Sequence, residues 1–204
     1  MRMGINDFSA NDFISNMDEN NLSRVFKIFG DERYSKKIAR EIVRIREFKT
    51  IKTEDLVQII DSVKKYQKTK IHNSTKIFQA LRILVNKEIS ELINALINSF
   101  QLIPIGGVIA VVTFHSIEDK IVKFFFKHYS EERNSSRYMP NEEVSEKCFK
   151  IINKKPIFPS LKEVSQNPPS RSAKLRYAIK INQTCNFNDL RKKFKYLTDV
   201  EELR

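Results

Sequence analysis

The side chains with the clearest potential for chemistry lie together in the middle of the chain. His115, Ser116 and Asp119 follow Val108–Val112, an apolar run rich in β-branched residues. Such a run is typical of a strand buried on both faces, as in a parallel sheet covered by helices. Ser116 is predicted to be a helix N-cap, because Glu118 and Asp119 place acids in the turn that follows it. His115 and Ser116 are therefore expected on a strand-to-helix loop, the sheet edge where open α/β proteins bind ligands.

This placement makes His115, Ser116 and Asp119 the candidate catalytic residues. The first two would help to position a substrate, although helix capping and local hydrogen bonding explain the same residue types. Asp119 either orients His115 or Lys120 or complements the helix dipole, and both interpretations stay open.

A second group of candidates is basic and follows a turn fixed by two prolines. Arg171, Lys174 and Arg176 come directly after Pro168-Pro169 and run into an alternating segment, Leu175–Ile181, that predicts a strand. Lys and Arg position nucleic acid through its phosphates without reading sequence. We therefore expect this turn to contact an RNA backbone.

A third group lies on a long predicted helix, Ser74–Phe100. His72 and Thr75 stand at its start, where a helix N-terminus suits an anion, although plain capping explains them equally well. Arg82 lies on a polar face of the same helix. All three are candidate RNA-binding residues.

The composition agrees with a polyanionic partner. The 204 residues contain 37 Lys and Arg against 25 Asp and Glu, a net charge of +12. The alternative is a coding bias that inflates lysine without any partner. The two cysteines, Cys148 and Cys185, show neither a metal-ligand spacing nor a disulfide framework, which favours a reducing, cytoplasmic compartment. No apolar run has the roughly 20 residues of a membrane helix.

The glycine count limits the cofactor sites that the chain can form. Its four glycines are Gly4, Gly30, Gly106 and Gly107, and none belongs to a glycine-rich loop. Such a loop lets the backbone approach a phosphate or nucleoside closely. We expect no cofactor-binding residue in this chain.

Three segments together resemble a known family. They are Lys70-Ile71-His72-Asn73-Ser74-Thr75-Lys76-Ile77-Phe78-Gln79-Ala80-Leu81-Arg82, Thr113-Phe114-His115-Ser116-Ile117-Glu118-Asp119-Lys120, and Asn167-Pro168-Pro169-Ser170-Arg171-Ser172-Ala173-Lys174-Leu175-Arg176. In this order the chain resembles the small-subunit ribosomal RNA cytosine-N4 methyltransferases, the RsmH/MraW family. Arg2-Met3 resembles the end of that family's Asp-x-Arg-Met element, which adds Arg2 to the RNA-binding candidates.

The resemblance implies an α/β fold: a partial Rossmann-like methyltransferase sheet with an all-helical insert domain. Residues 1–8 would be a remnant of the first half of the methyltransferase domain and 9–70 the RNA-recognition insert. Residues 71–182 would be the second half and 183–204 a charged tail. The cofactor would be S-adenosylmethionine, and the partner 16S ribosomal RNA or the small ribosomal subunit, with no metal and no membrane.

The family's cofactor motifs precede the Asp-x-Arg-Met element, so we expect the chain to be an N-terminally truncated portion. The alternative function is a non-catalytic RNA-binding or ribosome-assembly protein.

Overall fold

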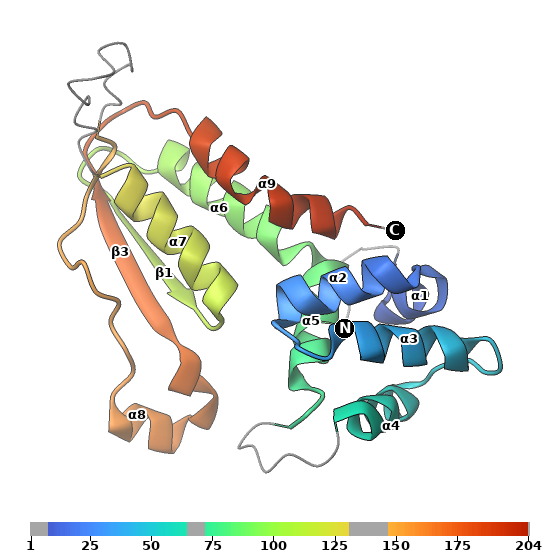
Figure 1. Ribbon diagram of the computed structural model, residues 1–204. Helices are drawn as coiled ribbons and strands as arrows, with labels where there is room; N and C mark the ends of the chain where they lie inside the picture. The colour runs from blue at the N-terminus through green and yellow to red at the C-terminus, as the bar shows by residue number, and fades with distance from the viewer. Residues whose placement is uncertain (1–7, 65–71, 131–146, 204) are drawn as a thin grey trace, which may run out of the picture. The chain divides into compact units, whose positions relative to one another are not determined.

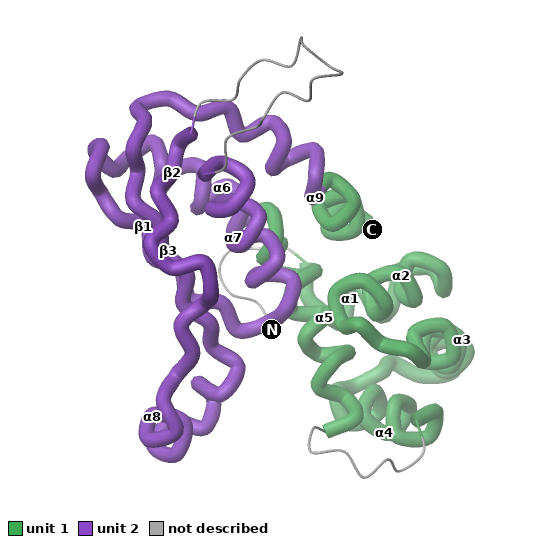
Figure 2. Tube along the Cα trace, turned by 60° about the vertical axis from the view of Figure 1, so that its left-hand side comes forward, with its two compact units in different colours: residues 1–90, 195–204 green, residues 91–194 purple. Residues whose placement is uncertain are grey.

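The first part of the chain is helical, as the spacing of its apolar residues requires. A computed structural model describes residues 8–64, 72–130 and 147–203, and it divides into two units (Figure 2). Unit 1 comprises residues 1–90 and 195–204, and unit 2 comprises residues 91–194. The helices of unit 1 are α1 (Ala10–Asn16), α2 (Glu19–Gly30), α3 (Ser35–Arg46), α4 (Thr53–Lys64) and α5 (Thr75–Asn86).

Unit 1 is built around α2, which packs against α3 and α5. The core-facing residues of α2 recur at three- and four-residue spacing and are buried; they are Leu22, Val25, Phe26 and Phe29. Gly30 ends α2, and a Cβ there would lie 2.6 Å from the backbone oxygen of Lys76. Only glycine therefore allows the start of α5 to approach so closely.

The predicted helix over Ser74–Phe100 is two helices in the structure, which corrects the sequence prediction. The chain turns at Lys87, whose φ of 49° is left-handed, and α6 (Glu88–Leu102) begins after it. The buried carboxylate of Glu201 accepts hydrogen bonds from the amides of Ile89 (2.7 Å) and Ser90 (2.9 Å). This carboxylate satisfies the first amides of α6, so the helix can start again without a local cap.

Unit 2 contains a three-stranded sheet whose described strands are all antiparallel. Its order is β1-β3-β2, and the strands are β1 (Val108–Thr113), β2 (Phe149–Lys150) and β3 (Lys174–Lys180). Helix α7 (Ser116–His128) packs against β1 and β3 (Figure 1). Between β2 and β3 the chain forms α8 (Leu161–Gln166) and the 3₁₀ turn η1 (Pro168–Ser172), and α9 (Asn188–Glu201) ends it.

The apolar run before His115 is a strand, but its predicted environment was wrong. Ile109 and Thr113 are buried, whereas Val108 and Val112 on the opposite face are 56% and 51% exposed. The neighbour of β1 in the described part of the chain is the antiparallel strand β3, not a parallel one. The alternation of burial along β1 follows from α7 covering one face, as is common in antiparallel sheets. The mixed α/β class is confirmed.

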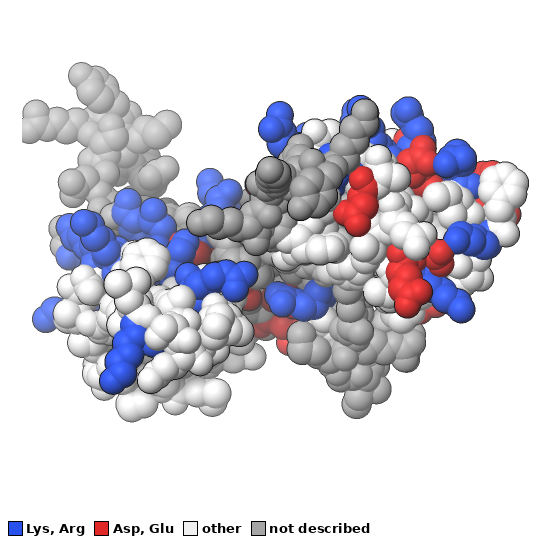
Figure 3. Space-filling model, turned by 90° about the horizontal axis from the view of Figure 1, so that it is seen from below, with Lys and Arg blue, Asp and Glu red and all other residues white. Residues whose placement is uncertain are grey.

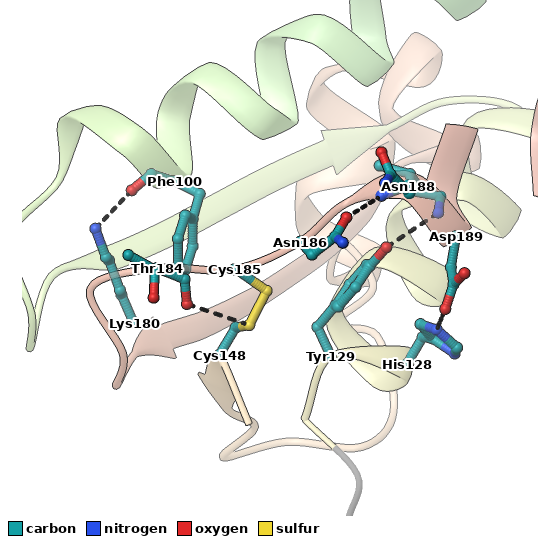
Figure 4. The surroundings of a disulfide bond; sticks show 11 residues. Phe100, His128, Tyr129, Cys148, Lys180, Thr184, Cys185, Asn186, Asn188 and Asp189 are labelled. Atoms are coloured by element: carbon teal, nitrogen blue, oxygen red, sulfur yellow. Dashed lines mark hydrogen bonds and ion pairs between the residues drawn. A yellow bond between two sulfur atoms is a disulfide. The ribbon is translucent and has the colours of Figure 1, made fainter. Parts of the chain in front are cut away.

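An aromatic cluster and a disulfide lie beside β2, and Figure 4 shows the disulfide and its surroundings. Phe125 and Phe149 pack edge to face at 5.0 Å, and both belong to a buried group that includes Phe100 and Phe187. Cys148 and Cys185 form a disulfide, which corrects the expectation from their sequence spacing. The pairing arises because β2 places Cys148 beside the segment that leads into α9, a proximity that no spacing motif records.

Lys180 is the most deeply buried cation among the described residues, with no exposed surface. Its Nζ donates to the carbonyl oxygens of Phe100 (2.8 Å) and Ile103 (2.9 Å) and lies 4.3 Å from the centre of the Phe100 ring. These carbonyls belong to the C-terminal end of α6, where a positive charge complements the helix dipole.

Replacing this ammonium should destabilise the fold. We expect Lys180→Met to lower the free energy of unfolding by about 2–4 kcal/mol, because two buried carbonyls lose charge-assisted hydrogen bonds while the side-chain volume is kept. Urea unfolding at neutral pH measures the change. The control Lys192→Met, at an exposed position of α9, should change stability by less than about 0.5 kcal/mol. Equally small effects of both substitutions would contradict the assigned role.

Candidate active site

The loop between β1 and α7 is held by a reciprocal pair of hydrogen bonds. His115, rather than the predicted Ser116, is the N-cap of α7: its Nδ1 accepts from the amide of Glu118 at 3.4 Å. In return the Glu118 carboxylate accepts from the amides of Phe114 (2.8 Å) and His115 (3.2 Å). This is a capping box with histidine in the place of serine, and the sequence signature missed it because it sought a hydroxyl.

The geometry also fixes the roles of the histidine ring. Because Nδ1 accepts a hydrogen bond, a neutral ring carries its proton on Nε2. Nε2 lies 3.3 Å from Oε1 of Glu118, but it has no well-directed hydrogen bond among the described residues. The His115 side chain is 8% exposed, so this residue positions the loop rather than projecting from it.

Glu118 remains ionised. Burial raises the pKa of its carboxyl, but the neighbouring His115 side chain and the amides of Phe114 and His115 lower it more, so the net pKa is below the ordinary value. The carboxylate is therefore a fixed negative group near neutral pH and cannot serve as a general acid there.

Asp119 joins the loop to the basic turn that follows Pro168-Pro169. Its Oδ1 lies 2.7 Å from Nε of Arg176, and its Oδ2 lies 3.1 Å from Nζ of Lys174. Burial raises the pKa of Asp119, but hydrogen bonds from Arg176 and Lys174 outweigh this effect and hold the pKa below its usual range. The candidate catalytic residue Asp119 therefore contacts the candidate RNA-binding residues Lys174 and Arg176, more than fifty residues away in the sequence. Neither predicted partner of Asp119, His115 or Lys120, is its ion-pair partner.

Two side chains of this loop are accessible. Ser116 is exposed as the first residue of α7, and Phe114 is 54% exposed. The sequence prediction named Ser116 but missed Phe114. An exposed aromatic ring beside the end of a strand suits the stacking of an unpaired base.

The remaining RNA candidates fall on several parts of the chain. Arg171 is exposed on η1, where its guanidinium lies 3.3 Å from the Pro168 carbonyl. His72, Thr75 and Arg82 belong to unit 1. Nδ1 of His72 lies 2.7 Å from the hydroxyl of Ser74, and Arg82 forms an ion pair with Glu88 at 2.7 Å. Arg2 lies outside the described residues.

The described glycines do not form a cradle for a nucleoside cofactor. Gly106 has a φ of 86° and donates its amide to the carbonyl of Lys180. A Cβ on Gly107 would lie 2.9 Å from the carbonyl oxygen of Pro104. Both glycines are thus required by a tight turn before β1, and neither belongs to a loop that could cradle a nucleoside. No helix in the described ranges is long and apolar enough to cross a membrane.

Comparison with known proteins agrees with this assembly of motifs. Residues 1–181 match the model of the MraW methylase family. The chain is 44% identical over 179 residues to ribosomal RNA small subunit methyltransferase H of Afipia carboxidovorans, covering 87% of this chain and 54% of that protein. The protein of the same name from Bartonella henselae is 39% identical over 193 residues, which cover 94% of this chain and 56% of that protein. The chain therefore spans about half the length of the curated relatives it matches.

The Asp119 ion pairs predict how stability changes with pH. A carboxyl whose pKa is depressed in the folded protein stabilises it above its unfolded pKa of about 3.9, and this contribution is lost as the pH falls through the folded pKa. Asp119→Asn should therefore cost about 2 kcal/mol near pH 7 and less below pH 4. Urea unfolding between about pH 7 and pH 3 tests this. The control is Glu163→Gln on the exposed part of α8; a loss for Asp119→Asn that does not depend on pH would refute the assignment.

Proposed function

The chain belongs to the MraW methylase family, and from this premise we propose that it serves S-adenosylmethionine-dependent methylation of cytidine N4 in 16S ribosomal RNA. One observation carries the proposal: Asp119, four residues after His115, forms ion pairs with Lys174 and Arg176, two of the basic residues that follow Pro168-Pro169. A methyltransferase that modifies RNA needs a rigid edge that receives a base beside cations that hold its phosphates. The relatives named ribosomal RNA small subunit methyltransferase H give the substrate class.

Each residue of the loop has a distinct part in this proposal. His115 and Glu118 are positioning residues that fix the strand-to-helix turn through their capping box. Phe114 stacks on the target base after it has left the RNA stack, and Ser116 donates or accepts a hydrogen bond to it. Asp119 fixes Lys174 and Arg176 beside the loop through its ion pairs. Exposed Arg171 is the residue proposed to contact the RNA backbone directly, and Lys174 and Arg176 add positive charge behind it.

S-adenosylmethionine would supply an activated methyl group, so the reaction needs no metal ion. The chemistry assigned to this chain is to hold the exocyclic amine in line for attack and to keep water away. We propose that its sheet is part of a larger Rossmann-like sheet and that residues 9–70 form an insert that assists RNA recognition. His72, Thr75, Arg82 and Arg2 are kept as RNA-contact candidates. We also propose that the protein acts in the cytoplasm, where a ribosomal substrate is found.

The alternative function is an RNA-binding or ribosome-assembly protein without catalysis. The observation that favours it is the absence of a fitting cofactor cradle among the described glycines. Two experiments separate the functions. The first is calorimetric titration of this chain with S-adenosylmethionine. The second is nucleoside analysis of unmethylated small subunits after incubation with the chain and S-adenosylmethionine. N4-methylcytidine in the RNA supports methyl transfer. Binding of RNA with neither cofactor binding nor methylated product supports the alternative.

The exposed hydroxyl of Ser116 gives the most specific test of the loop. Because His115 caps α7, Ser116→Ala should leave the melting temperature unchanged, yet it should lower kcat/KM for methyl transfer roughly tenfold through one lost hydrogen bond. Transfer of labelled methyl groups to unmethylated small subunits measures the rate. Ser165→Ala, on α8, is the matched control and should leave both quantities unchanged. A Ser116→Ala variant with wild-type kinetics would remove Ser116 from the site.

A further inference from the structure

Both units of the protein are basic. Over the full sequence, residues 1–90 and 195–204 contain 20 Lys and Arg against 15 Asp and Glu, and residues 91–194 contain 17 against 10. Their net charges are therefore +5 and +7. On the face drawn in Figure 3, blue side chains have few red neighbours around α8 of unit 2, whereas the two colours alternate over the helices of unit 1.

An opening beside β3 lies within unit 2. β2 pairs with β3 only at Ile179 and Lys180, and the chain meets β3 again where Ile157 exchanges two hydrogen bonds with Leu175. Between these two points the chain arches away from β3. The arch leaves a groove of about 780 Å³ that is bounded by α7, β3 and residues 147–154.

The described lining of this groove is cationic. It contains six basic residues and no carboxylate: Lys123, Lys127, Lys147, Lys150, Lys154 and Arg176. Lys123 and Lys150 are exposed on two different elements, α7 and β2, and neither has an ion-pair partner in the described ranges. Cations that repel one another across a groove are stabilised when a polyanion enters it.

The edge of β3 adds a backbone donor. Leu175 and Ile181 direct their amides toward the side of β2, as their bonds to Ile157 and Cys148 show. Antiparallel pairing alternates residue by residue, so the amide of Tyr177 points to the same side. It has no hydrogen-bond partner among the described residues of the arch. A backbone amide among lysines is a good donor for a phosphate oxygen.

We propose that this groove binds the sugar-phosphate backbone of single-stranded RNA. Lys123 on one bank and Lys150 on the other would each contact a phosphate, and the backbone amide of Tyr177, a residue that also lines the groove, would donate to a phosphate oxygen. Arg176 connects the groove to the loop, because its guanidinium bonds Asp119 and its side chain lines the groove. The proposal adds a substrate contact to the proposed function and in that sense rests on it.

Single-stranded RNA fits the groove better than other anions. The lysines come from α7, from β2 and from the residues on either side of β2, and cations from several elements suit the repeated charge of a polymer better than a single phosphate ion. The relatives named for methylating ribosomal RNA point to the same class.

The test compares two double variants that remove the same charge. Lys123→Ala with Lys150→Ala removes one lysine from each bank. Lys192→Ala with Lys193→Ala removes two exposed lysines of α9 that do not line the groove. Binding of a short fluorescein-labelled single-stranded RNA is followed by anisotropy at several salt concentrations, without S-adenosylmethionine. The groove variant should bind roughly tenfold more weakly, and the slope of log affinity against log salt should fall by about 1.5. The control should stay close to the wild type, and melting curves verify that both variants fold.

Three results would overturn the proposal: equal weakening by both variants, no weakening by either, or equal competition by polyglutamate. The first would show only a general charge effect, the second would place RNA elsewhere, and the third would make the groove a general polyanion site. The binding assay contains no cofactor, so its outcome does not depend on whether the chain transfers methyl groups. In the same way, a failure of the groove proposal would not affect the role proposed for Ser116.

Discussion

The strand-to-helix loop keeps its place because the carboxylate of Asp119 is ionised and paired inside the protein. With 14% of its side chain exposed, an isolated carboxylate there would be costly, and Arg176 and Lys174 offset that cost. The register of β1 and β3 makes this possible: Thr113 faces Lys174 and Val111 faces Arg176, so both cations emerge on the face that α7 covers. The depressed pKa of Asp119 and the position of α7 are thus two consequences of one contact. Arg176 extends that contact to the groove beside β3.

Helix α6 shows the same principle, with buried charges used to complete helix ends. Glu201 accepts the first amides and Lys180 donates to the last carbonyls, and both side chains are buried. Burial raises the pKa of Glu201, even though its hydrogen bonds from Ser90 and Ile89 lower it. The negative group therefore stabilises the helix start at some electrostatic cost, as expected for a carboxylate that only amides and a hydroxyl solvate. Charges used in this way are unavailable to a ligand, so Lys180 is not a candidate for RNA contact.

Local patterns predicted the elements, and tertiary contacts decided the details that the sequence missed. The β-branched run before His115 and the alternation after Lys174 are strands, because side-chain period and propensity are local properties. The break at Lys87 depends on Glu201, more than a hundred residues away. The disulfide joins cysteines 37 residues apart that only the folded sheet brings together. Asp119 was recognised as a candidate, but its true partners lie on another strand, and no spacing rule links them.

The distribution of charge bears on why the chain is basic. A coding bias toward lysine would raise the basic count wherever it acts, and both units are basic over the full sequence. What distinguishes the two units is how their described cations are paired. In unit 1 the cations are balanced locally: Lys64 pairs with buried Glu32 at 2.8 Å, Arg44 pairs with Glu41, and Arg46 donates to the carbonyls of Ile14 and Met17. In unit 2 the described lining of the groove beside β3 contains no carboxylate. A coding bias does not decide where carboxylates lie, whereas a groove that receives a polyanion favours their exclusion, since each carboxylate placed there would weaken binding.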